Sequence, residues 1–526
     1  MANFLNSIRI DNEFTLMQKD NFYVDKTLLI AKMNSFLGFK ERYKCITRPR
    51  RFGKTINAMM LATYYCKNLD ARHIFDRYKI RDSRTYLEHL NKHNVIFMSF
   101  NRGDGTFKSY DEFIRFFRGG LIEDLKELLP TLDESKPISS IFEDVYDETN
   151  NKFIFIIDEW DAIFNNELYT EDDRKNFLRF LTDLLKDNAY VELAYMTGVL
   201  PIAKHSGKST INMFLEYSAV NDNVFENYFG FTQEEVEKLC NKQEVEDGEK
   251  KIELKKLEEW YNGYYTHDGR KVYSPRSVIC ALINKHCDSY WTNTGPMEDI
   301  VDCIQGNVDK IRDDILKMLQ GDSIKIKLSL FSTEKMEFKS REQILSAMTI
   351  LGFLSYHKGA LTIPNRELKM KFADSLKNKK FGKFAEIVRN SNEMLNATLD
   401  RDTETMAQLL REAHSIYTPV LKYNDENSLA CVITIVYLSA LDDYVVSREE
   451  KSGEGFADFI FYPENKSDTS FIIELKVNKS ADVAVQQIKD RNYLQRLKNY
   501  TGEKLAIGIA YNSKTKEHEI KIEELS

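Results

Sequence analysis

The stretch Arg48-Pro-Arg-Arg-Phe-Gly-Lys-Thr55 decides the fold of the first part of the chain. An apolar run over 43–47 leads into it, and a helical pattern that begins at Ile56 follows it. A strand, a tight loop ending in Gly-Lys-Thr and a helix are the arrangement that holds nucleotide phosphates, because backbone N–H groups and the helix N-terminus point at the anion. The octet therefore predicts a phosphate-binding loop.

The residue types in the octet indicate what each side chain would do in such a loop. The Lys54 ammonium would reach the β- and γ-phosphate oxygens, and the Thr55 hydroxyl would bind Mg²⁺. Two positions depart from the general pattern, which has Gly where this chain has Arg48, while Pro49 has no N–H to donate. The loop residues predicted to bind the nucleotide are Arg50, Arg51, Gly53, Lys54 and Thr55.

A second feature supports the phosphate loop. Residues 152–161 form an apolar run of strand length that ends in carboxylates, which is typical of a central parallel strand. At the end of that strand Asp158 can hold Mg²⁺ through its water shell, and Glu159 can orient an attacking water. The alternative is a buried strand followed by a helix that Asp158 or Asp161 caps. Together with the Gly-Lys-Thr tripeptide, the nucleotide interpretation is favoured.

Length and composition limit the class of protein. A chain of 526 residues is too long for one core, so roughly two to four domains are expected. The start lacks a secretory signal and no window resembles a membrane span, so we expect a cytoplasmic protein without membrane contact. The seven cysteines form no Cys-x-x-Cys pair, which predicts buried thiols in a reducing compartment rather than a zinc site.

The net charge of −8 gives no signal for nucleic acid over the whole protein, but residues 366–389 are locally basic. Such a stretch can neutralise phosphates, and it can equally be a solvated helix face. Both interpretations stay open. The basic residues are Arg366, Lys369, Lys371, Lys377, Lys379, Lys380, Lys383 and Arg389.

Short apolar runs alternate with amphipathic stretches up to about residue 220, as in βαβ units with a parallel sheet. Thr197 ends the last of these strands, where a polar residue would sense the γ-phosphate, although a simple strand-end residue is the alternative. The expected strands are 43–47, 94–100, 153–157 and 191–197, with helices over 111–129 and 174–187.

Two further segments are expected to be helical. Residues 230–295 are rich in aromatic side chains and turn signals, which indicates a helical lid on the nucleotide domain. Residues 300–395 indicate a helical module with a hairpin over 353–363, for which a winged-helix-like shape is one alternative.

The C-terminal part carries a second chemical centre. The segment 455–462 has a strand pattern that contains Asp458, and a second strand over 471–477 contains Glu474 and Lys476 on one face. Carboxylates inside apolar strands are costly unless a partner such as a divalent cation satisfies them. Hairpin pairing would bring Asp458 beside the other two residues.

This set suits metal-assisted phosphodiester hydrolysis. Asp458 and Glu474 would bind Mg²⁺, and Lys476 would hold or activate a water and offset charge on the phosphorane. A helix over 484–493 could aim the Gln487 amide at the same site, and Glu426 could add a metal contact. The alternative is an ordinary cross-strand salt bridge.

The chain resembles AAA-ATPase-like proteins fused to a PD-(D/E)XK nuclease-like domain. The family's own phosphate loop has Arg at the position of Arg48. The resemblance rests on Phe22-Tyr-Val-Asp25-Lys26-Thr27, Thr47-Arg-Pro-Arg-Arg-Phe-Gly-Lys-Thr55, Ile156-Ile-Asp158-Glu159-Trp-Asp161, Tyr228-Phe-Gly-Phe-Thr232, Trp260-Tyr-Asn-Gly-Tyr-Tyr265, Tyr290-Trp-Thr-Asn-Thr-Gly295, Ile363-Pro-Asn-Arg-Glu367, Ala457-Asp458, Ile473-Glu474-Leu-Lys476 and Gln487-Ile488.

The resemblance implies a P-loop AAA-like ATPase core over 1–225, a helical lid over 226–298, a helical connector over 299–400 and a restriction-endonuclease-like α/β domain over 401–526. It implies that Asp158 and Glu159 are the acidic pair of the ATPase. It also implies nuclease roles for the three C-terminal residues above, with Gln487 in support. One departure concerns substrate contact: the family commonly has Gly-Arg-Ala-Asp where this chain has Gly455-Phe-Ala-Asp458.

Two functions from different classes follow. The first is an ATP-binding, Mg²⁺-dependent nuclease acting on DNA or RNA and regulated by ATP binding or hydrolysis. The second is a nucleotide-switched, signalling-type ATPase whose C-terminal domain binds nucleic acid or protein without cutting, since Arg48 and Pro49 favour slow hydrolysis. A phosphate loop that no longer binds nucleotide is a third alternative.

Overall fold

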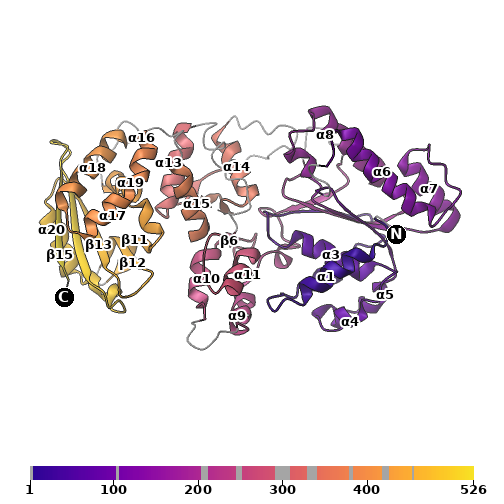
Figure 1. Cartoon of the computed structure of the whole chain (residues 1–526), viewed down its shortest axis with the longest axis horizontal. Helices are drawn as coiled ribbons and strands as arrows, with labels where there is room; N and C mark the ends of the chain where they lie inside the picture. The colour runs from indigo at the N-terminus through magenta and orange to yellow at the C-terminus, as the bar shows by residue number, and fades with distance from the viewer. Residues whose placement is uncertain are drawn as a thin grey trace. The chain divides into compact units, whose positions relative to one another are not determined.

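The computed structural model describes residues 4–101, 106–202, 211–243, 251–290, 308–328, 340–377, 383–417, 426–452 and 455–525. The chain forms two compact units (Figure 1). Unit 1 comprises residues 1–291 and 327–359, and unit 2 comprises residues 292–326 and 360–526. The two units divide the predicted connector 299–400 between them, and the four-domain division stays a prediction.

Unit 1 is built on a five-stranded sheet with the order β2-β3-β4-β1-β5. Every pairing in it is parallel. Because neighbouring parallel strands end at the same edge, the carboxyl ends of β3, β4 and β1 lie side by side. The strands are β1 (Tyr43–Thr47), β2 (Asn94–Ser99), β3 (Phe153–Asp158), β4 (Val191–Gly198) and β5 (Leu215–Ser218).

Helices cover both faces of this sheet (Figure 1). Phe155 and Ile157 of β3 belong to a core shared with α6, α7 and α8, whereas Ile154 and Ile156 belong to a second core shared with α1, α2 and α3. The alternation follows from the two-residue period of a strand. The helices of this region are α1 (Ile8–Gln18), α2 (Leu28–Asn34), α3 (Lys54–Tyr65), α4 (Arg72–Phe75), α5 (Tyr86–His89), α6 (Tyr110–Lys126), α7 (Ile138–Thr149) and α8 (Glu171–Leu185).

The structure confirms the expected strands and corrects some helix bounds. Helix α8 starts before residue 174 because Thr170 and Asp173 form a capping box ahead of the apolar pattern. Helix α6 ends before residue 129. The sequence missed β5, an edge strand whose residues are half-buried or exposed and therefore lack the continuous apolar run of the other strands.

Helices follow the sheet in the region predicted to be a lid. Thr232 and Glu235 form a capping box at the start of α9, and residues 291–295 of the predicted lid lie outside the described residues. Unit 1 also holds a helix and a strand from later in the sequence, α14 (Arg341–Leu351) and β9 (Ser355–His357). The lid elements are α9 (Gln233–Asn241), α10 (Leu254–Tyr261), β6 (Tyr264–Tyr265), β7 (Lys271–Val272) and α11 (Pro275–Asn284).

Unit 2 has its own five-stranded sheet, in the order β11-β12-β13-β14-β15. The pair β13 and β14 is parallel and the other pairs are antiparallel. Helix α20 makes the crossover between the two parallel strands, as such a connection requires. The strands are β11 (Tyr444–Ser452), β12 (Gly455–Pro463), β13 (Ser470–Val477), β14 (Lys504–Tyr511) and β15 (His518–Glu524).

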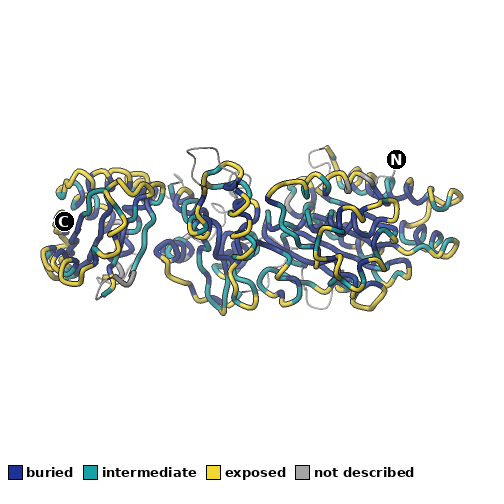
Figure 2. Tube along the Cα trace, turned by 90° about the horizontal axis from the view of Figure 1, so that it is seen from below, coloured by how far each residue is buried: buried dark blue, intermediate teal, exposed yellow. Residues whose placement is uncertain are grey.

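Each face of this second sheet is also covered. Ile472 packs with Val485 and Ile488 of α20, and on the other face the Tyr437 ring contacts the Phe461 ring at a tilt of 55°. Figure 2 shows buried segments in dark blue inside each unit and exposed segments in yellow on the outside. The remaining elements of unit 2 include α13 (Val308–Leu319), β8 (Ile324–Lys325), β10 (Ala360–Thr362), α15 (Arg366–Leu376), α16 (Lys383–Arg389), α17 (Ser391–Leu399), α18 (Thr403–Tyr417), α19 (Glu426–Val436) and α20 (Ala481–Asp490).

Both sheets with their flanking helices confirm the predicted α/β class. Within the described parts of the chain, no helix combines the length and the apolar character that crossing a bilayer requires.

Candidate nucleotide and metal sites

The predicted phosphate loop joins β1 to α3. Gly53 is the N-cap of α3 with φ 85°, a left-handed conformation that glycine adopts without a steric penalty. Since Gly53 has no side chain, it cannot cap the N–H groups of the first helical turn. The helix therefore begins at the carboxyl edge of the sheet, and phosphate binding at its N-terminus stays a prediction.

Lys54 is a buried cation of this loop. Its Nζ donates to the carbonyl oxygens of Arg48 at 3.0 Å and Pro49 at 2.9 Å. Burial lowers the pKa of Lys54 to about 8, and the carboxylates of Asp161 and Asp158 oppose that fall. The fold thus brings the predicted lysine next to the predicted acids.

Asp158 is the last residue of β3 and is buried. Burial raises the pKa of Asp158 to about 6, against a hydrogen bond from Thr55 and the charge of Lys54. Its Oδ1 is buried and has no hydrogen-bond partner among the described residues. A buried unpaired carboxylate oxygen beside a threonine hydroxyl fits a divalent cation, so the two predicted ligands of the ATPase metal lie together.

Glu159 follows directly, with φ 50°. A positive φ is uncommon for a residue other than Gly, Asn or Asp and bends the chain sharply at the end of β3. Burial lowers the pKa of Lys54, and the nearby Glu159 carboxylate opposes part of that fall. Its role in orienting water stays a prediction.

Asp161 has a role that the sequence did not predict. Its Oδ2 accepts hydrogen bonds from the N–H groups of Val199 at 3.0 Å and Leu200 at 2.7 Å. It therefore joins the loop after β3 to the loop after β4. Gly198 allows this approach, since a Cβ there would lie 2.4 Å from Asp161 Oδ1 and 2.6 Å from Trp160 Cδ1.

Thr197, predicted to sense the γ-phosphate, is fully buried in β4. Its hydroxyl donates to the carbonyl oxygen of Ile46 in β1 at 2.9 Å. This contact joins β4 to β1, the strand that leads into the phosphate loop, and the sensing role stays a prediction.

Arg48, which replaces the first glycine of the general motif, is a buried clamp. Its guanidinium donates to the carbonyl oxygens of Thr47 at 2.8 Å and Tyr217 at 2.9 Å and forms an ion pair with Asp222. It also lies over the Phe229 ring at 4.7 Å. The arginine therefore holds the end of β1 against β5. No pattern in the local sequence indicates that Asp222 is its partner.

Arg50 and Arg51 are half-buried in the same loop. Arg50 lies near enough to Lys54 to contribute to the lowered pKa of that lysine, after the larger effect of burial. Arg51 has φ 69°, so the loop contains a second left-handed position besides Gly53. Their contact with a nucleotide stays a prediction.

In unit 2, β12 and β13 diverge at the predicted acidic residues. The antiparallel ladder runs from Phe461 opposite Phe471 to Phe459 opposite Ile473, so the next pair would be Asp458 and Glu474. There the pairing stops, and Asp458 Oδ2 instead accepts the N–H of Leu475 at 2.7 Å. We call the place where the two strands part the fork. It holds the carboxylates of Asp458 on β12 and Glu474 on β13.

Glu474 is buried at the base of this fork. Its Oε1 accepts from Lys476 Nζ at 2.9 Å and from Gln487 Nε2, whereas its buried Oε2 has no hydrogen-bond partner among the described residues. Burial and the charge of Asp458 raise the pKa of Glu474 to about 7. Two close carboxylates, one with an unpaired buried oxygen, fit a metal ion better than a simple salt bridge.

All four nuclease residues predicted from the sequence thus meet in one place. Lys476 is buried and also donates to the Leu475 carbonyl oxygen at 2.9 Å. Gln487 reaches the fork from α20. Within the described residues no three His, Cys, Asp or Glu side chains converge as a complete metal site. Mg²⁺ does not require one, because it commonly takes one or two carboxylates together with phosphate and water.

Two family models match the sequence. Residues 7–207 match the family described as "Predicted AAA-ATPase", and residues 424–520 match the PD-(D/E)XK nuclease superfamily. The chain is an AAA-ATPase-like protein fused to a PD-(D/E)XK nuclease superfamily domain. The matched segments contain the phosphate loop and the fork, respectively. No curated protein matches the sequence.

Solved structures with similarity to this fusion protein include Walker-type and signalling ATPases. The Walker-type ATPase PABY2304 of Pyrococcus abyssi has 12% identity and a TM-score of 0.36, covering 66% of this chain and 95% of its own. The ORC2 protein of Aeropyrum pernix has 10% identity and a TM-score of 0.30, covering 68% and 93%. A STAND protein with a tetratricopeptide repeat sensor from Pyrococcus horikoshii has 12% identity and a TM-score of 0.26, covering 79% and 56%.

Tyr493 supports the fork of the nuclease-superfamily domain, a role that no sequence pattern indicated. Asn492 turns the chain after α20 with φ 51°, which asparagine tolerates. The Tyr493 hydroxyl then donates to the Phe456 carbonyl oxygen at 2.7 Å and lies 3.5 Å from Gln487 Nε2. It therefore links β12 to the residue that holds Glu474.

Glu426, the further metal contact suggested by the sequence, is exposed at the start of α19. Burial raises the pKa of Asp458, and the charge of Glu426 adds to that rise. The role of Glu426 as a metal contact stays a prediction.

Some residues of the basic stretch 366–389 make ion pairs and hydrogen bonds within the fold. Arg366 is buried, pairs with Glu464 and donates to the Leu441 carbonyl oxygen at 3.0 Å. Lys377 pairs with Asp374 at 2.9 Å, and residues 378–382 lie outside the described residues. Phosphate binding by this stretch stays a prediction, and Arg366 has a structural role instead.

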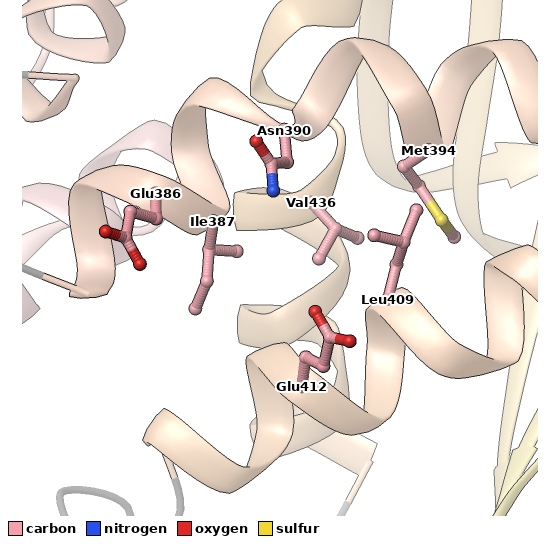
Figure 3. A pocket seen from close by; sticks show the side chains of 7 residues that line it. All are labelled: Glu386, Ile387, Asn390, Met394, Leu409, Glu412 and Val436. Carbon is pink, nitrogen blue, oxygen red and sulfur yellow. The ribbon is translucent and has the colours of Figure 1, made fainter.

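A small cavity of about 100 Å³ lies among α16, α17, α18 and α19 (Figure 3). Its lining is largely aliphatic, with the carboxylates of Glu386 and Glu412 and the amide of Asn390 as polar groups. None of its lining residues belongs to either candidate site.

Proposed function

We propose that this protein is a Mg²⁺-dependent nuclease whose cutting of DNA or RNA is regulated by ATP binding or hydrolysis. The observation that best supports this proposal is the fork, where Asp458, Glu474, Lys476 and Gln487 meet. One buried oxygen of Glu474 there has no hydrogen-bond partner among the described residues. The free thiols among the described cysteines fit the reducing cytoplasm expected from the sequence.

Asp458 and Glu474 would hold the metal, which when bound supplies a Lewis acid and lowers the pKa of a coordinated water. Hydrolysis adds water to the phosphorus, breaks the bond to the leaving sugar oxygen and moves one water proton to that oxygen. The Lys476 ammonium offsets negative charge that develops on the phosphorane. Gln487 keeps the Glu474 carboxylate oriented through its amide.

In the ATPase-like domain, Gly53 and the N-terminus of α3 would bind the phosphates, with Lys54 on the β- and γ-oxygens. Thr55 and Asp158 would hold Mg²⁺, and Glu159 would orient the attacking water. The unpaired Oδ1 of Asp158 supports this assignment.

Cleavage of single-stranded DNA and of plasmid by the full chain, with and without Mg²⁺, tests the nuclease. We expect Lys476→Ala to lose at least about a hundredfold in rate, the typical effect of one charge-stabilising group. The matched control is Lys479→Ala, because Lys479 is exposed after the end of β13. Equal cleavage by wild type and Lys476→Ala would reject the assignment.

A nucleotide-switched binding protein is the second candidate, favoured by Pro49, which gives the loop no N–H at that position. Steady-state ATP hydrolysis separates the two. Fast turnover stimulated by DNA argues against a passive switch, whereas tight ATP binding without turnover supports it. ATP binding that Lys54→Ala abolishes and that the exposed Lys67→Ala retains would show that the loop binds nucleotide.

A further inference from the structure

One hydroxyl group contacts the arm of the fork that carries Asp458. The Tyr493 hydroxyl donates to the carbonyl oxygen of Phe456 at 2.7 Å, two residues before Asp458 on β12. The ladder between β12 and β13 has its last pair at Phe459, so this bond lies beyond that ladder. The hydroxyl therefore holds β12 on the open side of the fork.

The oxygen of the same hydroxyl faces the support of the other arm. Gln487 Nε2 lies 3.5 Å from it and also donates to Oε1 of Glu474. An amide nitrogen has two hydrogens, and the tyrosine proton is already given to β12, so the hydroxyl oxygen can only accept here. These two acceptors keep the NH₂ end of the Gln487 amide turned toward the Glu474 carboxylate.

The Tyr493 ring cannot follow a moving strand. It is fully buried and packs in the core beneath the sheet with Val485 and Ile488 of α20. Side chains in such close-packed surroundings keep one position on the time average. The hydroxyl is therefore a fixed point between the two strands of the fork.

Gly455 leaves the space that the hydroxyl occupies. A Cβ at this position would lie 2.8 Å from the Tyr493 hydroxyl oxygen and 2.8 Å from Arg491 Nη1. The exposed Arg491 side chain can move aside, whereas the buried tyrosine cannot. Gly455 does not have a positive φ, so space rather than backbone conformation excludes a side chain here.

We infer that Tyr493 is a positioning residue of the metal site. Its hydroxyl, which Gly455 admits, holds the Asp458 arm in place. Through Gln487 it also orients the Glu474 carboxylate. The inference rests on the proposed nuclease function, because it assigns a further residue to the metal site of that reaction.

A buried tyrosine hydroxyl can also do no more than satisfy one carbonyl group, in which case its loss lowers stability and leaves metal binding unchanged. The same sheet provides a matched control for that case. The Tyr444 hydroxyl donates to the carbonyl oxygen of Thr469 at 3.0 Å, before the start of β13 and away from the fork. Tyr444→Phe and Tyr493→Phe therefore each remove one such hydrogen bond.

Mn²⁺ in place of Mg²⁺ gives a readout that does not depend on cleavage, because the paramagnetic resonance signal of free Mn²⁺ falls on binding to the full chain. The Mn²⁺ bound at the fork is the part that Asp458→Ala removes. We expect Tyr493→Phe to weaken this binding about tenfold, as for other groups that orient a metal ligand. Tyr444→Phe should bind Mn²⁺ as wild type does, although both variants unfold at a lower temperature.

Unchanged Mn²⁺ affinity in Tyr493→Phe would overturn the inference, and so would an equal loss of affinity in the two phenylalanine variants. Gly455→Ala is an independent test, because the added methyl group displaces the hydroxyl and should weaken Mn²⁺ binding by a similar factor. The double variant should lose little more than either single variant, since phenylalanine lacks the oxygen that the methyl group would meet. Two losses that multiply in the double variant would contradict the shared role.

Cleavage assays on the same variants separate this inference from the proposed function. Mn²⁺ binding that depends on Tyr493, without any Mg²⁺-dependent cleavage by wild type, keeps the positioning role and rejects the nuclease. Mg²⁺-dependent cleavage together with Mn²⁺ affinity that Tyr493→Phe leaves unchanged keeps the nuclease and rejects the positioning role.

Discussion

Lys476 Nζ lies 2.9 Å from Oε1 of Glu474, two residues earlier on the same strand, and so pairs with one oxygen of that carboxylate. The other oxygen, Oε2, is buried without a hydrogen-bond partner among the described residues. The lysine and the amide of Gln487 therefore orient the carboxylate and leave Oε2 available to a cation.

Replacing Gln487 by alanine should raise the Mg²⁺ concentration needed for half-maximal cleavage by about tenfold, the usual effect of losing a group that orients a metal ligand. Gln486→Ala is the matched control, because Gln486 is exposed and bonds Asp490 instead. Titration of Mg²⁺ in the cleavage assay measures both. A similar shift in both variants would contradict the role of Gln487.

The stability of the metal-free protein should depend on pH through Glu474. The pKa of this group rises from 4.5 to about 7 on folding, so the folded state binds its proton more tightly than the unfolded state does. The associated stability is fully present below pH 4.5 and is lost as pH rises to about 7, by on the order of 1–3 kcal/mol.

Glu474→Gln removes that titration, so the pH dependence of the unfolding free energy should flatten over the same window. Denaturant unfolding at a series of pH values, followed by a probe in the nuclease-superfamily domain, measures it. Added Mg²⁺ should restore stability to wild type at higher pH and not to the variant. An unchanged pH dependence in Glu474→Gln would show that Glu474 is not the titrating group.

Gly198→Ala should destabilise the ATPase-like domain by about 1–3 kcal/mol, because the new methyl group overlaps Asp161 and Trp160. ATP binding should weaken as well, since Asp161 adjoins Lys54. Gly119→Ala is the control. Gly119 lies in α6 with no atom within 4 Å of the added Cβ, so this substitution should stabilise the helix slightly. Thermal unfolding in which both variants behave alike would contradict the packing argument.

Arg48→Gly restores the general phosphate-loop motif yet should lower stability by about 3 kcal/mol, because it leaves the buried Asp222 without its cation. The exposed Arg81→Ala should be neutral in the same unfolding measurement. Adding Asp222→Asn to Arg48→Gly should recover part of the loss, since an unpaired amide costs less than an unpaired charge. A stable Arg48→Gly single variant would rule out the clamp.

Much of this fold was predictable because its central strands are buried on both faces. Every residue of β1 and β3 is buried, and 153–157 is apolar throughout, whereas the edge strand β5 is half-buried or exposed and was missed. The fork was predictable for a different reason. Charged residues interrupt two apolar strands, and the two-residue period sets Glu474 and Lys476 on one face.

Contacts between distant segments could not be predicted in this way. Asp222, Asp161 and Tyr493 act on residues of other elements, and nothing in their own neighbourhoods distinguishes them from ordinary loop residues. Their roles depend on how loops meet at the edges of the sheets, which a single sequence does not reveal. The same holds for Arg366, whose buried pairing looked from the sequence like part of a basic surface.

Each arm of the fork keeps one strand neighbour. Strand β12 stays paired with β11 as far as Gly455, and β13 stays paired with β14 as far as Val477, so the two arms part only from each other, at Asp458 and Glu474. The spacing of the two carboxylates is therefore set by two anchored backbones. Such a frame should select divalent ions by radius, because neither strand is free to shift toward a smaller ion or away from a larger one.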